Sequence, residues 1–214
     1  NAPIRTSRSL RCFCKMFGKK EFSSSVDAIV VGLGNFGREY EMTRHNAGFM
    51  VLDRLAEKQQ VKLDRIKFKG LCNTCELAGK KVLLLKPTTY MNLSGQSVVE
   101  AMQFYKVPIE RVIVVCDDVM QDVGKLRIRR KGSDGGQNGL KNIIYLTGSD
   151  AFPRVRVGVG KKPHPDYNLA DWVLSRFHAD ELKKLQTAVE HAVESVPLLV
   201  QGNIDEAMNL YNTK

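Results

Sequence analysis

The feature that most constrains the fold is the stretch Ile29 to Gly48, which reads IVVGLGNFGREYEMTRHNAG. It opens with an apolar β-branched run, typical of a buried strand, and continues through the glycines of GLGNFG. A helix is expected to begin near Thr43 or His45. A strand–turn–helix passage places polar side chains at the carboxyl end of a sheet, where α/β proteins build their sites. The stretch therefore predicts an α/β fold with a site near Asn35 and His45.

The rest of the chain alternates between strand-like and helix-like segments. Strands are expected over 28–31, 68–77, 82–86, 112–116, 125–130 and 154–159. Helices are expected from about 43 to 58, up to 105, and over 140–146, 179–200 and 204–211. The run 170–174 also reads as strand-like, with Trp172 in the core. Alternation of this kind predicts one α/β domain over 26–214, a single twisted mixed sheet flanked by helices.

The charge of the chain favours a polyanionic partner. Lysine and arginine number 33 against 23 acidic residues, a formal net charge of +10. Such a surplus favours nucleic acid first and an anionic membrane second, and a merely soluble basic protein is the alternative. No run approaches the roughly 18 apolar residues of a membrane helix. The net charge therefore indicates a class of partner, but it does not indicate which reaction the protein catalyses.

Residues 1–25 differ in composition from the rest. Six cations precede the first acidic residue, Glu21, and serines follow it: Arg5, Arg8, Arg11, Lys15, Lys19 and Lys20 come before, Ser23 to Ser25 after. Basic, serine-containing and acid-poor segments are typical of organelle transit peptides. The alternative is a disordered basic arm that touches RNA. Either interpretation keeps this segment outside the fold and starts the domain near Val26.

The five cysteines argue against a disulfide framework, because their number is odd and their spacing irregular. Cys72 and Cys75 form a C-x-x-C pair, but no second pair or nearby histidine completes a metal site. On a strand, residues three apart point to opposite faces. We therefore expect core and surface thiols, with no metal and no cofactor.

Five polar residues stand at turns or element ends and could meet at one edge of the sheet: Asn35, His45, Asn92, Asp117 and Asn138. A histidine with a carboxylate partner is the minimal general base, and asparagines can bind carbonyl oxygens. No serine or cysteine stands in a recognisable nucleophile motif, so water is the natural nucleophile. The alternatives are a structural histidine and turn-forming asparagines. GLGNFG also resembles part of a dinucleotide fingerprint, but the later glycines do not fit it.

Four motifs together resemble the bacterial-type peptidyl-tRNA hydrolase family. They are GLGNFGREYEMTRHNAG from Gly32, KPTTYMNLSG from Lys86, VVCDDV from Val114 and GSDGGQNGLKNI from Gly132. The likeness covers nearly everything from Ala28 to Tyr211, in order. It implies the fold of that family and cleavage of the ester between a peptide and the terminal ribose of tRNA, without metal or cofactor.

The resemblance also implies roles for individual residues. His45 would activate water, Asp117 would orient His45, and Asn35 would complete the catalytic set. The remaining residues implied to contact substrate or tRNA are Tyr40, Asn92, Asn138, Lys125, Arg127 and Arg129. On a strand, Lys125, Arg127 and Arg129 would share one face and meet phosphates.

Two positions depart from the family pattern. Phe36 stands where the family usually has proline, and Gln137 stands where the glycine-rich loop usually has histidine. Glutamine cannot titrate near neutral pH, although it still donates and accepts hydrogen bonds. With the transit-like start, these substitutions resemble a plant plastid branch of the family that facilitates splicing of chloroplast group II introns. The expectation is a splicing facilitator of the chloroplast stroma with weak or lost hydrolase activity. The alternative is an active organellar hydrolase.

A splicing adaptor requires partners. The expected ones are RNA-binding splicing proteins, with group II intron RNA reached through them and tRNA-like RNA also possible, and no membrane. An adaptor needs an exposed apolar patch, for which Phe36, Met120 and Val123 are candidates because they lie in turns near the predicted site. Ordinary loop packing is the alternative for all three.

Overall fold

The computed structural model describes residues 25–212, and in that part of the chain seven strands form one sheet in the order β2-β3-β4-β1-β5-β7-β6. The strands are β1 (Ala28–Gly32), β2 (Arg65–Lys67), β3 (Gly70–Leu77), β4 (Lys80–Pro87), β5 (Val112–Asp118), β6 (Leu126–Arg129) and β7 (Arg154–Gly158). The inner strands β4, β1, β5 and β7 pair in parallel, while β2, β3 and β6 run antiparallel to their neighbours. The mixed sheet predicted from the sequence is therefore confirmed.

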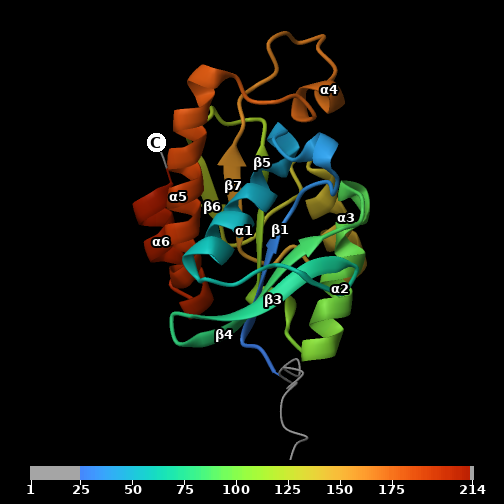
Figure 1. The fold of residues 1–214 in the computed structure, drawn as a ribbon, viewed down its shortest axis with the longest axis vertical. Coiled ribbons are helices and arrows are strands. Elements are labelled where there is room, and N and C mark those ends of the chain that lie inside the picture. The colour runs from blue at the N-terminus through green and yellow to red at the C-terminus, as the bar shows by residue number, and fades with distance from the viewer. Residues whose placement is uncertain (1–24, 213–214) are drawn as a thin grey trace, which may run out of the picture.

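Helices cover both faces of this sheet (Figure 1). They are α1 (Ala47–Lys58), α2 (Ser94–Tyr105), α3 (Asn138–Thr147), α4 (Leu169–Val173), α5 (Ala179–Gln201) and α6 (Ile204–Tyr211), with the short 3₁₀ turns η1 (Arg38–Tyr40), η2 (Arg44–Asn46), η3 (Met91–Leu93) and η4 (Ile109–Arg111). Helices α1, α5 and α6 pack on one face, and α2 and α3 on the other. None of the helices in the described part is long and apolar enough to cross a membrane.

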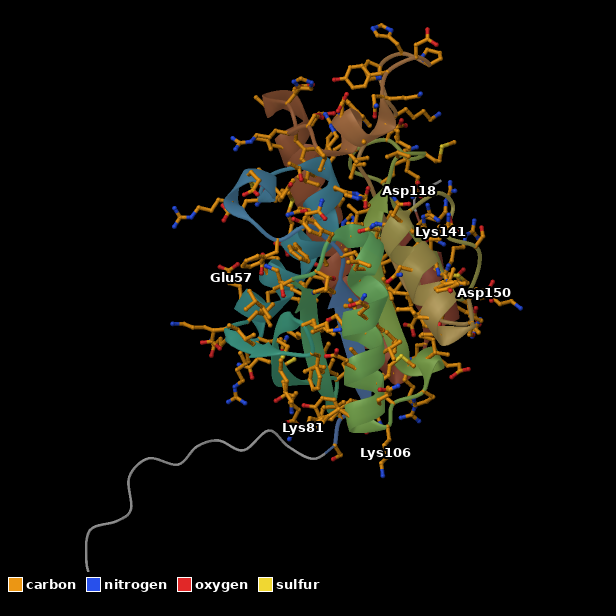
Figure 2. The ribbon with its side chains drawn as sticks, turned by 90° about the vertical axis from the view of Figure 1, so that its right-hand side faces the viewer. Glu57, Lys81, Lys106, Asp118, Lys141 and Asp150 are labelled. Carbon is orange, nitrogen blue, oxygen red and sulfur yellow. The ribbon has the colours of Figure 1, made fainter. Side chains whose placement is uncertain are left out.

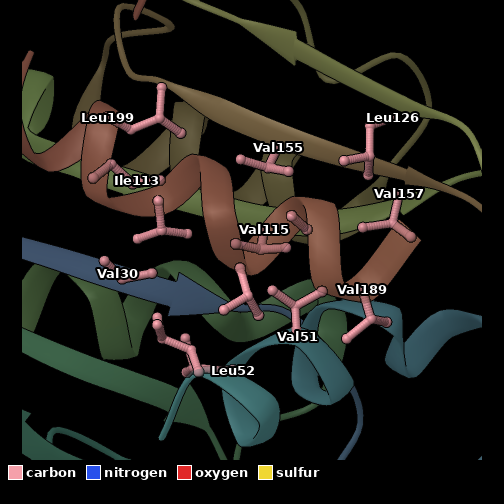
Figure 3. Packing of buried hydrophobic residues seen from close by; sticks show 14 of the residues in the cluster. Val30, Val51, Leu52, Ile113, Val115, Leu126, Val155, Val157, Val189 and Leu199 are labelled. Atoms are coloured by element: carbon pink, nitrogen blue, oxygen red, sulfur yellow. The ribbon is translucent and has the colours of Figure 1, made fainter. Parts of the chain in front are cut away.

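Alternation along the inner strands explains the two layers. In β1, Val30 faces the cluster with α1 and α5, while Ile29 and Val31 face the cluster with α2 and α3. Figure 3 shows the first cluster, in which Val51 of α1 and Val189 of α5 pack over the strands. A strand buried on both faces must be apolar throughout, which is why the inner parallel strands read as continuous hydrophobic runs.

The C-x-x-C pair follows the same rule. Cys72 packs in the cluster with α2 and Cys75 in the cluster with α1, so the two thiols point to opposite faces of β3, as predicted. Burial raises the pKa of each to about 11. Within residues 25–212, no group of three or more histidine, cysteine or acidic side chains is placed to hold a metal ion.

Two predicted strands differ from the structure. The strand expected over 68–77 is present as β3 but begins two residues later, at Gly70, because Phe68 and Lys69 have positive φ and form the turn between β2 and β3. The run expected as a strand around Trp172 is the helix α4, capped by Asn168, whose Oδ1 accepts from Ala170 N at 2.8 Å. Ala78 and Gly79 both have positive φ and form the hairpin turn between β3 and β4.

The parallel strands end at the edge of the sheet where α4 lies (Figure 1). Figure 2 shows Asp118 near that edge, while Lys81 and Lys106 lie at the other. Gly48 lets the start of α1 approach closely, because a Cβ there would overlap the carbonyl oxygens of Leu33 and Val115. The turn η2, which carries His45, is thereby held above the ends of β1 and β5.

The basic segment predicted over 1–25 lies outside the described residues except for Ser25. Its transit-like role and the domain boundary near Val26 stay predictions.

Candidate active site

The centre of the site is a histidine–carboxylate pair. His45 Nδ1 lies 2.9 Å from Asp117 Oδ2, and Asp117 is almost completely buried at the end of β5. Because Nδ1 faces the carboxylate, it carries the proton and leaves Nε2 as the nitrogen that can accept one. His45 lines the main cavity, so a water molecule there could be deprotonated by Nε2. The predicted pairing of His45 with Asp117 is present.

The pKa of His45 is raised above its ordinary value by competing effects. Burial, the largest, lowers the pKa because it disfavours the imidazolium, whereas the charge of Asp117 and its hydrogen bond raise it, and together they prevail. Asp117 therefore increases the basicity of the imidazole as well as fixing its orientation.

Gln137 holds the other oxygen of the same carboxylate. Its Nε2 donates to Asp117 Oδ1 at 3.1 Å, and its Oε1 accepts from Leu140 N at 2.8 Å, which caps α3. One buried side chain thus fixes Asp117 and begins the helix that carries Asn138. The sequence suggested that this glutamine disables the site. The structure instead shows it supporting the His45–Asp117 pair.

Replacing Gln137 with alanine is expected to lower the free energy of unfolding by about 1–3 kcal/mol, because a helix cap and a bond to a buried carboxylate are lost together. Urea denaturation measures the change. The matched control is Gln201→Ala, at an exposed glutamine near the end of α5, which should change stability by less than about 0.5 kcal/mol. Equal losses in both variants would contradict the dual role of Gln137.

Asn35 is fixed by a residue that the sequence pattern did not single out for a role. Its backbone N–H donates to Asn46 Oδ1 at 2.8 Å, and Asn46 Nδ2 donates to Asn35 O at 2.9 Å. Asn35 Oδ1 accepts from Met91 N at 2.9 Å. Asn35 therefore joins the first turn to η3, and it also lines the main cavity.

The main cavity has a volume of about 520 Å³. The polar residues that line it are Asn35, His45, Asn92, Asp117, Gln137, Asn138 and Arg156, and the other lining residues include Tyr90, Met91, Val119 and four residues in or directly after α4. Asn92 and Asn138 are exposed at the starts of η3 and α3, so their amides are free to contact a ligand. All three predicted asparagines thus meet His45 and Asp117 around one cavity.

Tyr40, predicted beside the site, does not line this cavity. It lies in η1, where its carbonyl oxygen accepts from Thr43 N at 3.0 Å and from Thr43 Oγ1 at 2.8 Å. The structure therefore gives Tyr40 a part in shaping the turn before His45, while a direct contact with substrate stays a prediction.

The three candidate partner residues do not form one patch in the described structure. Phe36 is 57% exposed and lines a second cavity with Phe49 and Met50, whereas Met120 is 64% exposed and lies beside the basic strand β6. Val123 is half-buried against the hydrophobic core, which is ordinary loop packing. Partner binding through Phe36 or Met120 stays a prediction.

The predicted alternation of the basic strand is confirmed for β6. Arg127 and Arg129 are exposed, while Leu126 and Ile128 are buried. Lys125 immediately precedes the strand, and its carbonyl oxygen accepts from Gly158 N at 2.8 Å. The side chains of Arg127 and Arg129 line a cavity of about 330 Å³ with Lys131, and that cavity shares Gly135 and Arg156 with the main one. Asp118 orients Arg156 by accepting from its Nε at 3.0 Å.

This arrangement can activate water beside several amide groups, with a cationic surface adjoining. Comparison with known proteins identifies the family that shares it. The model of the family described as "Peptidyl-tRNA hydrolase" matches residues 29–214. The chain belongs to the peptidyl-tRNA hydrolase family.

Individual members of the family are similar along almost their whole length. The protein named peptidyl-tRNA hydrolase from Caldicellulosiruptor bescii is 50% identical over 187 residues, which cover 87% of this chain and 97% of that protein. The one from Caldanaerobacter subterraneus subsp. tengcongensis is 52% identical over 184 residues, covering 86% and 98%. A crystal structure of the peptidyl-tRNA hydrolase from Acinetobacter baumannii superposes with a TM-score of 0.81 at 37% identity, covering 89% of this chain and 99% of that one.

These relatives overturn the main functional expectation. A non-catalytic facilitator of chloroplast group II intron splicing is contradicted, because the relatives that are about half identical are bacterial proteins named as hydrolases. The expectation that the chain is no enzyme loses its support as well. The departures at Phe36 and Gln137 leave the His45–Asp117 pair intact, and Gln137 donates a hydrogen bond to Asp117. The stromal location and the protein partners stay predictions.

Proposed function

We propose that this protein is an active peptidyl-tRNA hydrolase. A water molecule in the main cavity gives a proton to His45 Nε2 while its oxygen attacks the ester carbonyl carbon. The tetrahedral intermediate then expels the ribose oxygen, which takes the proton back from the imidazolium. The products are a peptide with a free carboxylate and a tRNA with a free ribose hydroxyl.

The asparagine side chains supply the remaining interactions. The amide groups of Asn92 and Asn138 can donate to the carbonyl oxygen as it gains negative charge, and Asn138 also begins α3, whose amino end favours an anion. Asn35, fixed by Asn46, can bind the peptide backbone. The chain's own groups therefore cover the base, its orientation and the developing oxyanion.

The observation that carries this proposal is the contact of His45 Nδ1 with the buried Asp117 carboxylate, in a residue that lines the same cavity as three asparagines. The test is hydrolysis by the purified full chain. N-acetylaminoacyl-tRNA should release its acyl group at catalytic enzyme concentrations, whereas aminoacyl-tRNA, which lacks the peptide bond, should be a poor substrate. Production of the chain should also restore growth to a hydrolase-deficient bacterium. No release of the acyl group by folded protein would overturn the proposal.

The basic surface of β6 fits the phosphates of the RNA part of the substrate. Replacing Arg127 and Arg129 together by glutamine is expected to raise KM about tenfold or more at low salt. The slope of log KM against log salt concentration should also decrease by roughly one for each phosphate contact that is lost. Steady-state kinetics between low and moderate salt measure both effects. The control is Arg111→Gln in η4, an exposed arginine at the amino end of β5, away from the cavity. An equal rise in KM for this control would argue against a specific phosphate contact.

A further inference from the structure

Arg44, the neighbour of His45, is completely buried and connects four segments of the chain. Its Nη1 donates to Val159 O at 2.6 Å, after β7, and its Nε donates to Ser175 Oγ at 3.3 Å, after α4. Glu181 of α5 completes the set by accepting from Nη1 at 3.1 Å and from Nη2 at 2.7 Å. A guanidinium is suited to this position because its planar fork offers several fixed donors.

Aromatic rings enclose the same guanidinium. Its Cζ lies 3.9 Å from the ring centroid of Trp172 in α4 and 4.8 Å from that of Phe177. Trp172 Nε1 in turn donates to Gly160 O at 2.8 Å. Cation–π contacts are strongest where the guanidinium is desolvated, as it is at this buried position. Trp172 is therefore held by Arg44 rather than by the hydrophobic core in which the sequence placed it.

The segment that Arg44 holds forms one wall of the main cavity. Leu169, Ala170, Val173 and Leu174 line that cavity, and all four lie in or directly after α4. The preceding residues, 161–168, are mostly exposed, and α4 packs on η2, the turn that contains both Arg44 and His45. Figure 1 shows α4 and the segment before it above the end of the sheet. The wall thus has limited support besides the contacts around Arg44.

Backbone contacts reinforce this link. Arg44 N donates to Ser175 O at 3.0 Å, and Thr43 forms an antiparallel bridge with Arg176. The main chain therefore places the residues after α4 beside η2, and the Arg44 side chain reaches further, to Trp172 inside the helix. Loss of the side chain would free α4 while the backbone bridge remained.

We propose that Arg44 is a positioning residue that fixes the α4 wall of the cavity on the turn carrying His45, so that the peptide part of the substrate is held against the general base. This inference rests on the proposed function. Arg44 itself touches no reacting atom, because its guanidinium is enclosed by Trp172, Phe177 and Glu181. Its effect is on peptide binding, through Leu169, Val173 and their neighbours.

The test compares Arg44→Lys with wild type. Lysine keeps the charge but cannot make the forked contacts, so the wall should loosen while the chain stays folded. KM for a tripeptidyl-tRNA is expected to rise about tenfold, with kcat falling less than about threefold and with a smaller rise in KM for N-acetylaminoacyl-tRNA. Mere loss of folded protein would lower apparent kcat for both substrates equally and leave KM unchanged, and that result would overturn the proposal.

Trp172 provides a second readout that needs no activity, because it is the chain's sole tryptophan. Its fluorescence should shift to longer wavelength in Arg44→Lys, and proteolysis within 161–175 should become faster. The matched control is Arg54→Lys, which alters a half-buried arginine that pairs with Glu57 and Glu190 away from the cavity. An unchanged Trp172 spectrum in Arg44→Lys, or an equal change in Arg54→Lys, would overturn the proposal.

A variant on the wall keeps the inference falsifiable if Arg44→Lys fails to fold. Trp172→Leu, at a half-buried position, removes the ring and should produce the same selective rise in KM for the longer peptide. Equal KM changes for long and short substrates would contradict the proposal. Absence of hydrolysis by wild-type protein would instead refute the proposed function, and the Trp172 spectrum would still decide whether Arg44 fixes α4.

Discussion

Replacing His45 with alanine is expected to lower kcat by about 10²–10⁴-fold, the usual contribution of a positioned general base. The reason is geometric. Among residues 25–212, His45 is the histidine that lines the main cavity, and a carboxylate at its Nδ1 raises its pKa. The loss should appear in kcat more than in KM, because proton transfer occurs in the transition state and the asparagines still bind the substrate.

Single-turnover hydrolysis of N-acetylaminoacyl-tRNA measures this effect without interference from product release. The control is His191→Ala, which removes a histidine of α5 whose ring lies 6.0 Å from that of Tyr211. This variant should retain full activity. If His45→Ala lost less than about tenfold in kcat, His45 would not be the general base.

The fold followed from local patterns because the inner strands obey a simple burial rule. Val112 to Cys116 read as a central strand from an unbroken β-branched run, and β5 is buried along its whole length. The helix expected over 204–211 appears with those same bounds as α6. Apolar periodicity carries this information by itself, since each face of a strand or helix must be either buried or exposed.

Detail was lost where tertiary contacts outweigh local preference. Phe68 prefers a strand by type, yet it takes positive φ in the turn between β2 and β3, where its ring packs against Phe104 and Tyr105 of α2. Trp172 suggested a core strand, although it lies in the helix α4 and its ring stacks on the Arg44 guanidinium. Neither the hairpin partner nor the guanidinium can be found from the neighbouring sequence.

The residues that line the site could be predicted from the sequence, but the hydrogen bonds that hold them in place could not. His45, Asp117 and the three asparagines come from turns that meet at one edge of the sheet, as expected for an α/β fold. The bonds of Gln137 and Asn46 to their neighbours join residues 20 and 11 positions apart, and no local signal specifies them. The sequence shows that Gln137 cannot titrate and can still form hydrogen bonds, but it does not show that the acceptor is Asp117.

Replacing Asp117 with asparagine is expected to be almost as damaging as removing His45, with a kcat loss of about 10²-fold or more. An asparagine amide can donate to Nδ1, which would place the imidazole proton on Nε2, the nitrogen that must accept one from water. The variant also removes the influences that raise the pKa of His45, while burial, which lowers it, remains. The residual activity should therefore differ from that of wild type in its pH dependence as well as in its size.

The sign of the pH effect follows from that balance. In wild type, protonation of His45 abolishes the base, so kcat/KM should fall on the acid side with a midpoint above the usual histidine pKa. In Asp117→Asn the midpoint should move to lower pH. The raised pKa of wild-type His45 also stabilises the folded state at pH values below the histidine's unfolded pKa, and this contribution disappears as pH rises through its folded pKa. The difference in free energy of unfolding between wild type and Asp117→Asn should therefore decrease as the pH rises from the unfolded to the folded pKa of His45.

Profiles of kcat/KM against pH, with urea denaturation at several pH values, test these statements. Asp118→Asn is the matched control, since Asp118 is an adjacent buried carboxylate bonded to Arg156 and Gln121 instead of His45. It can lower stability, but it should leave the acid-side midpoint close to that of wild type. A midpoint that moves equally in both variants would show that general loss of negative charge, rather than the specific contact at 2.9 Å, sets the basicity of His45.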